Sequence, residues 1–180
     1  MLVTAVLAAG CTAAVEGTPT AQPPAPLPQR PREVRLDGVD PCSLLTPEQR
    51  TELGLETAPR SSTSYVELFQ GEVSSCTMLG FQPDAVGVGI STVTTAGIER
   101  WRETDLAARV QPTSVTDFPA VVAVPIRSTT YCSVEVDVAA GQLLDVQFND
   151  GGRRPPVQQD ELCRRAEQVA VAAMTTLLTS

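Results

Sequence analysis

The sequence predicts an α+β domain, in which helices pack on one face of an antiparallel sheet. Residues 131–138 and 144–148 alternate between apolar and polar side chains, which predicts two strands of a hairpin. Helix signals stand at both ends of the domain, at residues 46–54 and 157–178. The expected order is helix, strands, helix, strands, helix, crosslinked by two disulfides and preceded by a disordered tether.

The first helix is predicted from its start and stop signals. Thr46 can cap it, Pro47 suits the first helical position, and Gln49 stands where a capping-box partner belongs. Gly54 then ends the helix.

The middle of the chain predicts short strands and a short helix. Strands are expected at residues 65–69, 73–81 and 86–90. Residues 96–106 have helical spacing and contain Trp101, the only tryptophan. This residue has two interpretations, as a platform on which a ligand stacks or as a core or cap residue.

A strand at residues 119–126 precedes the hairpin, whose two faces differ in polarity. In its first strand Cys132, Val134, Val136 and Val138 face one way, and Tyr131, Ser133, Glu135 and Asp137 face the other. Gly141 marks the turn, and Asp145 and Gln147 continue the polar side on the second strand. We expect this polar face to lie in water.

The longest helix is expected at residues 157–178, after Pro155 and Pro156. Asp160 and Glu161 near its start favour the helix dipole. Its apolar stripe consists of Leu162, Ala166, Val169, Ala170, Ala173 and Leu177. The many alanines indicate close packing of this helix across the sheet.

Residues 1–10 are typical of a lipoprotein signal peptide. A short apolar run ends in Ala8, Ala9 and Gly10, and Cys11 follows directly. We expect Cys11 to be acylated and to become the first residue of the mature protein. No basic residue precedes Cys11, so we expect the true start codon to lie upstream. The alternative is an unprocessed apolar N-terminus with a chance cysteine.

Residues 11–38 are predicted to be the lipidated cysteine and a proline-rich linker, followed by a single domain at residues 39–180. The linker contains six prolines among small and polar residues, so it buries too little apolar surface to fold. A proline-rich recognition ligand is the alternative interpretation. The protein is therefore expected at the cell membrane, lipid-anchored on the extracytoplasmic face.

The composition excludes several classes of chemistry. The chain has a net charge of −8, which disfavours nucleic acid as a partner. It contains neither histidine nor lysine, so a histidine-activated nucleophile, a histidine zinc ligand and a Schiff base are all absent. We expect no cofactor and no enzymatic activity. Arginine is the only basic residue type in the chain, and Ala, Val, Gly and Pro are abundant. This composition is typical of a GC-rich genome such as that of an actinobacterium.

Carboxylate chemistry is what remains, but the spacing of the acidic residues matches no template. Asp145, Asp150, Asp160 and Glu161 are interpreted as solvated or helix-capping residues. Residues 145–152 faintly resemble a calcium loop without its closing glutamate, and a turn after a strand is the better interpretation.

Four cysteines follow Cys11, and an even number in an exported domain predicts disulfides. Of the three possible connectivities we favour Cys76–Cys132 and Cys42–Cys163. The first pair would join two strands, and the second would close the two ends of the domain. A four-thiolate metal site is the alternative, although no C-x-x-C pair is present.

Several segments in this order resemble a known family. They are the residues around Cys11, the proline-rich spacer, Asp40-Pro-Cys-Ser-Leu-Leu-Thr46, Cys76, Tyr131-Cys-Ser-Val-Glu-Val136 and Glu161-Leu-Cys-Arg-Arg-Ala166. Together they resemble the actinobacterial lipoprotein family catalogued as domain of unknown function 3558. The resemblance covers residues 39–178 and implies an exported, membrane-anchored domain, with no catalytic residue to carry over.

The leading functional hypothesis is a non-enzymatic binding module of the cell envelope, with a partner protein, a wall component or a small hydrophobic ligand. One alternative is a carboxylate-dependent cell-wall hydrolase, which requires two acidic residues to converge. The other is an accessory or sensor module of an envelope complex.

Overall fold

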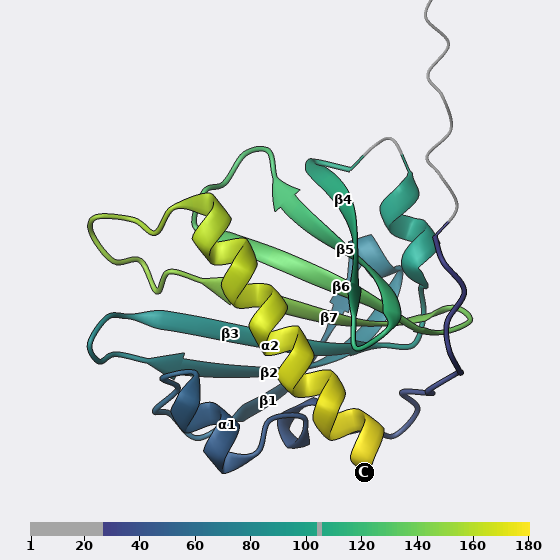
Figure 1. Cartoon of the computed structure of the whole chain (residues 1–180), viewed down its shortest axis with the longest axis horizontal. Coiled ribbons are helices and arrows are strands. Elements are labelled where there is room, and N and C mark those ends of the chain that lie inside the picture. Colours follow the sequence, from purple (N-terminus) through teal and green to yellow (C-terminus); the bar gives the residue numbers. More distant parts are fainter. Residues whose placement is uncertain (1–26, 104–105) are drawn as a thin grey trace, which may run out of the picture.

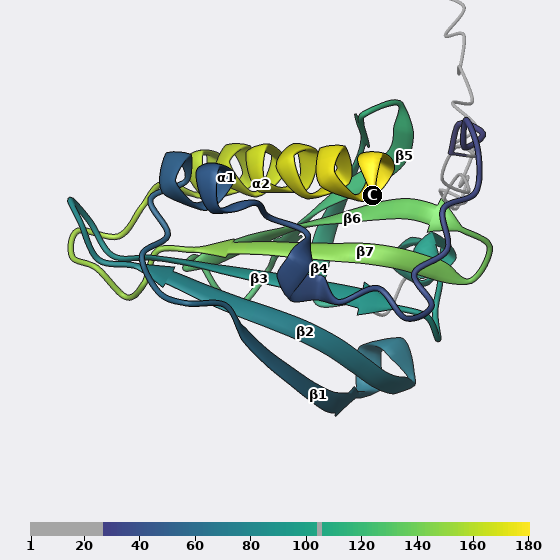
Figure 2. The ribbon, with the colours of Figure 1, turned by 90° about the horizontal axis from the view of Figure 1, so that it is seen from below.

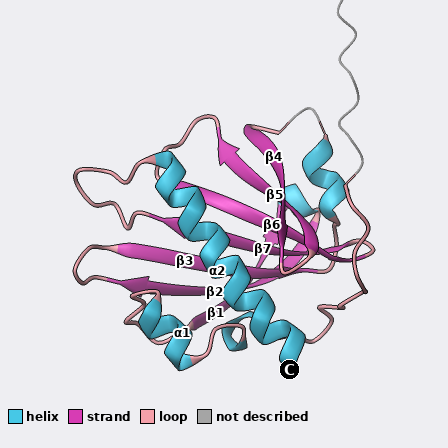
Figure 3. Cartoon of the chain, viewed as in Figure 1, coloured by secondary structure: helices cyan, strands magenta, loops and turns pink. Residues whose placement is uncertain are grey.

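In the computed structural model, which describes residues 27–103 and 106–180, seven strands form one antiparallel sheet (Figures 1 and 3). The strands are β1 (Arg60–Val66), β2 (Gly71–Gly80), β3 (Val86–Val93), β4 (Ala108–Val115), β5 (Phe118–Pro125), β6 (Tyr131–Ala139) and β7 (Gln142–Asn149). Their order in the sheet is β1-β2-β3-β7-β6-β5-β4. The signal peptide, Cys11 and most of the predicted linker lie outside the described residues.

Two α-helices, α1 (Pro47–Glu52) and α2 (Gln159–Thr179), cover one face of the sheet (Figure 2). The predicted α+β class, with helices on one face of an antiparallel sheet, is therefore confirmed. Three short 3₁₀ turns complete the fold: η1 (Pro41–Ser43), η2 (Glu67–Phe69) and η3 (Ile98–Arg102). The helix expected at residues 96–106 is thus only a five-residue 3₁₀ turn.

The capping signals explain where α1 begins. The Thr46 side chain accepts a hydrogen bond from the Gln49 amide, and the Gln49 side chain accepts one from the Thr46 amide. The predicted capping box is therefore present. In addition, the Gln49 side-chain amide donates to the Ala172 carbonyl of α2, which fixes the two helices to each other.

The main core lies between α2 and the sheet. The buried face of α2 consists of Leu162, Ala166, Val169, Ala170, Ala173, Met174 and Leu177. This is the predicted apolar stripe with Met174 added. The small alanines let the helix approach β6 and β7 closely, where Val134, Val136, Leu144 and Val146 are fully buried.

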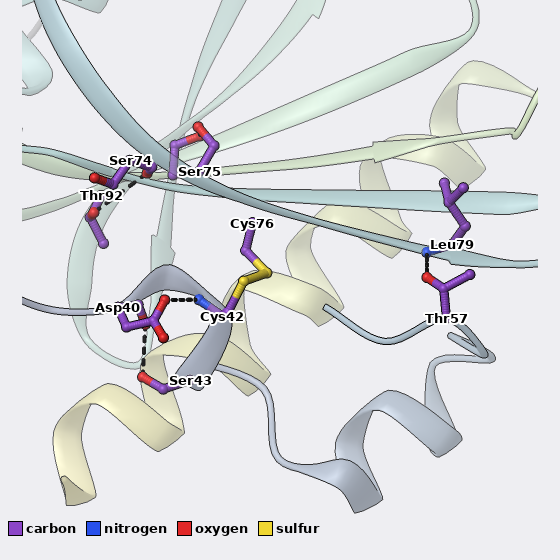
Figure 4. Close-up of a disulfide and its surroundings, with 10 residues drawn as sticks. Asp40, Cys42, Ser43, Thr57, Ser74, Ser75, Cys76, Leu79 and Thr92 are labelled. Atoms are coloured by element: carbon purple, nitrogen blue, oxygen red, sulfur yellow. Dashed lines mark hydrogen bonds between the residues drawn. A yellow bond between two sulfur atoms is a disulfide. The ribbon is translucent and has the colours of Figure 1, made fainter. Parts of the chain in front are cut away.

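Two disulfides join this face of the sheet to its helical cover, and both predicted pairings are wrong. Cys42 of η1 bonds to Cys76 of β2 (Figure 4), and Cys132 of β6 bonds to Cys163 of α2. Cys76 and Cys132 stand on strands separated by β3 and β7, which is about 14 Å at the usual strand spacing. A disulfide tolerates a Cα separation of about 7 Å at most, so Cys76–Cys132 cannot form. Each strand cysteine bonds instead to the helical turn above it.

The domain also begins earlier than the sequence indicates. Leu36, assigned to the linker, is 1% exposed, and the Val34 amide donates to the Val138 carbonyl of β6. The Arg30 guanidinium contacts both carboxylate oxygens of Asp137 at 2.7 and 2.8 Å. Residues 27–38 therefore pack on the domain, and we call them the N-terminal strap.

Candidate functional site

The second face of the sheet, opposite α2, carries a cover of its own, so the expected wet face is wrong. Ser133, Glu135 and Asp137 of β6 and Asp145 of β7 are all buried. A smaller apolar cluster lies on this face, formed by Phe69, Val73, Val93, Ile98, Trp101, Val121, Ala123 and Leu143. Because η2 and η3 contribute to this cluster, they shield the polar side chains from water.

A pair of carboxyl groups lies beneath this cover. Glu135 and Asp145 are register partners on β6 and β7, so their side chains are direct cross-strand neighbours. Glu135 is 0% exposed and Asp145 is 3% exposed. Among the described residues, no donor makes a hydrogen bond to either carboxyl oxygen of Glu135. Asp145 accepts a hydrogen bond of 3.3 Å from the Gln147 side chain.

The surroundings of this pair favour its protonated forms. Burial, and then the negative charge of Asp145, raise the pKa of Glu135 well above its ordinary value. Burial raises the pKa of Asp145 to about 6, although hydrogen bonding to Ser91 and Gln147 opposes the rise. Two adjacent carboxyl groups in a dry site cannot both be charged at low cost, so the pair retains a proton under mildly acidic conditions.

An apolar pocket of about 240 Å³ opens beside the carboxyl pair, and we call it the Trp101 pocket. Its walls are Leu68, Trp101, Leu106, Ala107, Ala108, Ala123, Pro125, Tyr131 and Ser133. Turns η2 and η3, the segment before β4, the start of β4, the end of β5 and the start of β6 supply these residues. Ser133 precedes Glu135 by two residues on the same face of β6, so the polar floor of the pocket borders the carboxyl pair.

Trp101, in the wall of this pocket, carries a hydrogen-bond donor that has no partner among the described residues. This donor, the indole Nε1, is buried. Buried tryptophan N–H groups usually find a partner, because an unpaired donor loses its hydration without compensation. The pocket has largely apolar walls that include Trp101.

A second pocket, of about 390 Å³, is polar and a weaker candidate. It lies beside η1 and is lined by residues that include Asp37, Asp40, Glu72 and Ser74. Asp40 already accepts from the Cys42 amide (Figure 4), and Asp37 accepts from Arg35 and Gln142. These carboxylates are structural, so a ligand here would have to displace existing bonds.

The predictions made from the sequence are right for some of these residues and wrong for others. Trp101 is 8% exposed and packs in the second cluster, which confirms its interpretation as a core residue. It also lines the pocket, and its role as a stacking platform stays a prediction. Asp145 and Asp150 are buried, so their interpretation as solvated or helix-capping residues is wrong. Asp150 accepts from the Gly152 amide, which confirms the predicted turn.

Asp160 and Glu161 lie in the first turn of α2, as expected. The sequence missed Glu135 as a candidate. The one available signal for a site was that Glu135 stands in a predicted strand. Alternation along that strand cannot reveal that η2 and η3 cover its polar face.

Neither α-helix in the described part of the chain has the length and hydropathy needed to cross a membrane.

Comparisons with known proteins bear on the family alone. No curated protein and no solved structure matches the chain. A comparison with protein families matches residues 6–176, nearly the whole sequence, to the family described as "Protein of unknown function (DUF3558)". The expected resemblance to domain of unknown function 3558 is confirmed, and the chain belongs to this family.

Proposed function

We propose that the protein is a lipoprotein of the cell envelope, anchored through acylated Cys11, whose domain binds a small, largely apolar ligand in the Trp101 pocket. Two disulfides support export, because they persist in oxidising compartments and are rare in the cytosol. The small residues before Cys11 support the anchor.

The observation that carries the binding proposal is the chemistry of the pocket walls. An apolar cavity of about 150 Å³ accepts one benzene ring, so the 240 Å³ pocket has room for a ring with substituents or a short piece of acyl chain. The Ser133 hydroxyl in the pocket lining would donate to an acceptor oxygen on the ligand. The preferred ligand is therefore an apolar molecule with a carbonyl, ether or hydroxyl oxygen.

Trp101 provides the test, because the only tryptophan of the chain lines the pocket. The full chain is titrated with N-phenyl-1-naphthylamine, an uncharged apolar dye. We expect saturable dye fluorescence with energy transfer from Trp101. Ala108→Phe, which places a ring in the pocket, should weaken binding at least tenfold.

Gln111→Phe is the matched control, since it adds the same ring to β4 at an exposed position on the opposite face of the sheet. Equal weakening by both variants, or no saturable binding to the unmodified chain, would remove the proposal.

A carboxylate-dependent wall hydrolase is the second candidate, favoured by the convergence of Glu135 and Asp145. Its difficulty is that Glu135 is fully buried and does not line the pocket. Incubation with purified wall glycan, followed by measurement of new reducing ends, tests it. Activity equal to that of Glu135→Gln argues against hydrolysis.

A further inference from the structure

The rim of the Trp101 pocket carries an exposed apolar side chain. Ile126 follows the pocket residue Pro125 and is 58% exposed. Its amide donates to the carbonyl of Ala107, an exposed pocket residue, at 2.9 Å. This hydrogen bond fixes Ile126 beside the opening of the pocket.

An arginine adjoins this rim. Arg127 follows Ile126, and its side chain is exposed. The chain as a whole has a net charge of −8, so a cationic group beside an exposed apolar residue contrasts with the remaining surface. An exposed apolar residue next to an arginine suits contact with anionic lipid headgroups.

The N-terminal strap places the lipid-bearing end of the chain close to this site. Leu27, the first described residue, packs against the cluster that contains Trp101. Ala108, the first residue of β4, packs against the same cluster, and Figure 1 shows the strap entering on the side of the sheet's β4 end. The fifteen residues 12–26 separate Leu27 from Cys11, and at most about 3.4 Å per residue they span about 50 Å. A lipid anchor on Cys11 would therefore keep the pocket within reach of the bilayer.

Resting on the proposed function, we infer that the Ile126 rim docks on the bilayer and that the Trp101 pocket takes the end of an acyl chain from an anionic phospholipid. The apolar walls suit methylene groups, and the pocket has room for a short chain segment. Arg127 would meet the phosphates. The ligand thus comes from the membrane and not from the aqueous phase.

The test uses the full chain with Cys11→Ser, so that no lipid anchor contributes to binding. Vesicles of phosphatidylglycerol and phosphatidylcholine, with bromine atoms on the acyl chains, are added while Trp101 fluorescence is recorded. Bromine quenches only a nearby indole, so we expect quenching by brominated vesicles and none by unbrominated vesicles of the same headgroups. Pure phosphatidylcholine vesicles should quench weakly, because they lack net negative charge.

Two variants separate rim docking from general adhesion. Ile126→Glu should reduce quenching at least tenfold and leave dye binding unchanged. Phe81→Glu is the matched control, because Phe81 is 54% exposed on the turn between β2 and β3 and should leave quenching intact. Arg127→Gln should weaken vesicle binding about fivefold, the usual effect of one arginine at an anionic surface.

The possible outcomes distinguish the two proposals. Saturable dye binding without bromine quenching overturns the acyl-chain inference and leaves the proposed function in place. Equal losses in Ile126→Glu and Phe81→Glu also overturn the inference, since docking would then not be specific to the rim. Absence of dye binding would contradict both the proposed ligand-binding function and the acyl-chain inference.

Discussion

At the scale of single residues, the Glu135–Asp145 pair couples folding to pH. Burial raises the pKa of both groups, so the folded state holds protons that the unfolded chain releases near pH 4. The stabilising contribution of the pair is therefore complete below about pH 4 and decreases as the pH rises through the folded pKa values. For Asp145 a rise of about two pKa units corresponds to about 3 kcal/mol.

We predict that Glu135→Gln flattens this dependence, because glutamine is a neutral isostere of the protonated acid. Urea unfolding between pH 4.5 and 7.5 should show the original chain losing stability as the pH rises and the variant losing less. Glu72→Gln, at an exposed position of β2, is the control and should retain the original slope. Parallel slopes for the original chain and Glu135→Gln would contradict the assignment.

At the scale of elements, each disulfide joins one strand to one helical turn. The closed loops span 34 and 31 residues, so the chain-entropy model gives each bridge a similar stabilisation of about 3.7 kcal/mol. The bridges also act at different places, since Cys42–Cys76 fixes η1 to β2 and Cys132–Cys163 fixes the first turns of α2 to β6.

A tryptic digest without reduction should identify this connectivity. Cleavage after arginine predicts residues 36–50 linked to 61–100, and residues 128–153 linked to 154–164. A linked pair of 61–100 with 128–153 would contradict the structure. Replacing both Cys132 and Cys163 with alanine should lower the melting temperature by roughly 10 °C, and replacing both Cys42 and Cys76 should have a similar effect.

Local signals in the sequence predicted the elements that depend on them. The capping box of α1, the apolar stripe of α2 and the β6–β7 hairpin were all predictable, because each depends on spacing within a few turns or strands. The disulfides were not, because alternation along a strand shows which cysteines share a face but not how many strands separate them. The strand β4 was not predicted, since its residues 108–115 include Pro112 and lack a clear alternation.

At the scale of the whole molecule, the N-terminal strap extends the domain beyond the boundary that its prolines suggested. The prolines indicated a linker up to residue 38, yet Leu36 is buried and its amide donates to the Gln142 side chain. Such long-range contacts leave no periodic pattern in a short, irregular segment. The same reasoning applies to the carboxyl pair, whose cover comes from η2 and η3.

Arg30→Gln should release the strap, since it leaves the buried carboxylate of Asp137 without its cation. Arg30 is itself partly exposed, so the expected cost is roughly 1–2 kcal/mol, between that of surface and buried ion pairs. Arg32→Gln is the control, because the Arg32 guanidinium makes only a 3.4 Å contact to the Leu178 carbonyl. Amide exchange at Val34 should accelerate in the first variant and stay unchanged in the second.

The order of the strands has a consequence for a chain that is cut once. Strands β1 to β3 come from residues 60–93 and strands β4 to β7 from residues 108–149, and the two groups meet only at the β3–β7 boundary. The Cys42–Cys76 disulfide lies wholly before residue 93, and the Cys132–Cys163 disulfide lies wholly after residue 108. Cleavage between residues 93 and 108 would therefore produce two fragments with no covalent link, and denaturing electrophoresis would separate them without any reductant. Recombined, the fragments would rebuild the domain through the β3–β7 seam, the contacts of the N-terminal strap with β6 and the contact of α1 with α2, which makes this protein suited to fragment complementation.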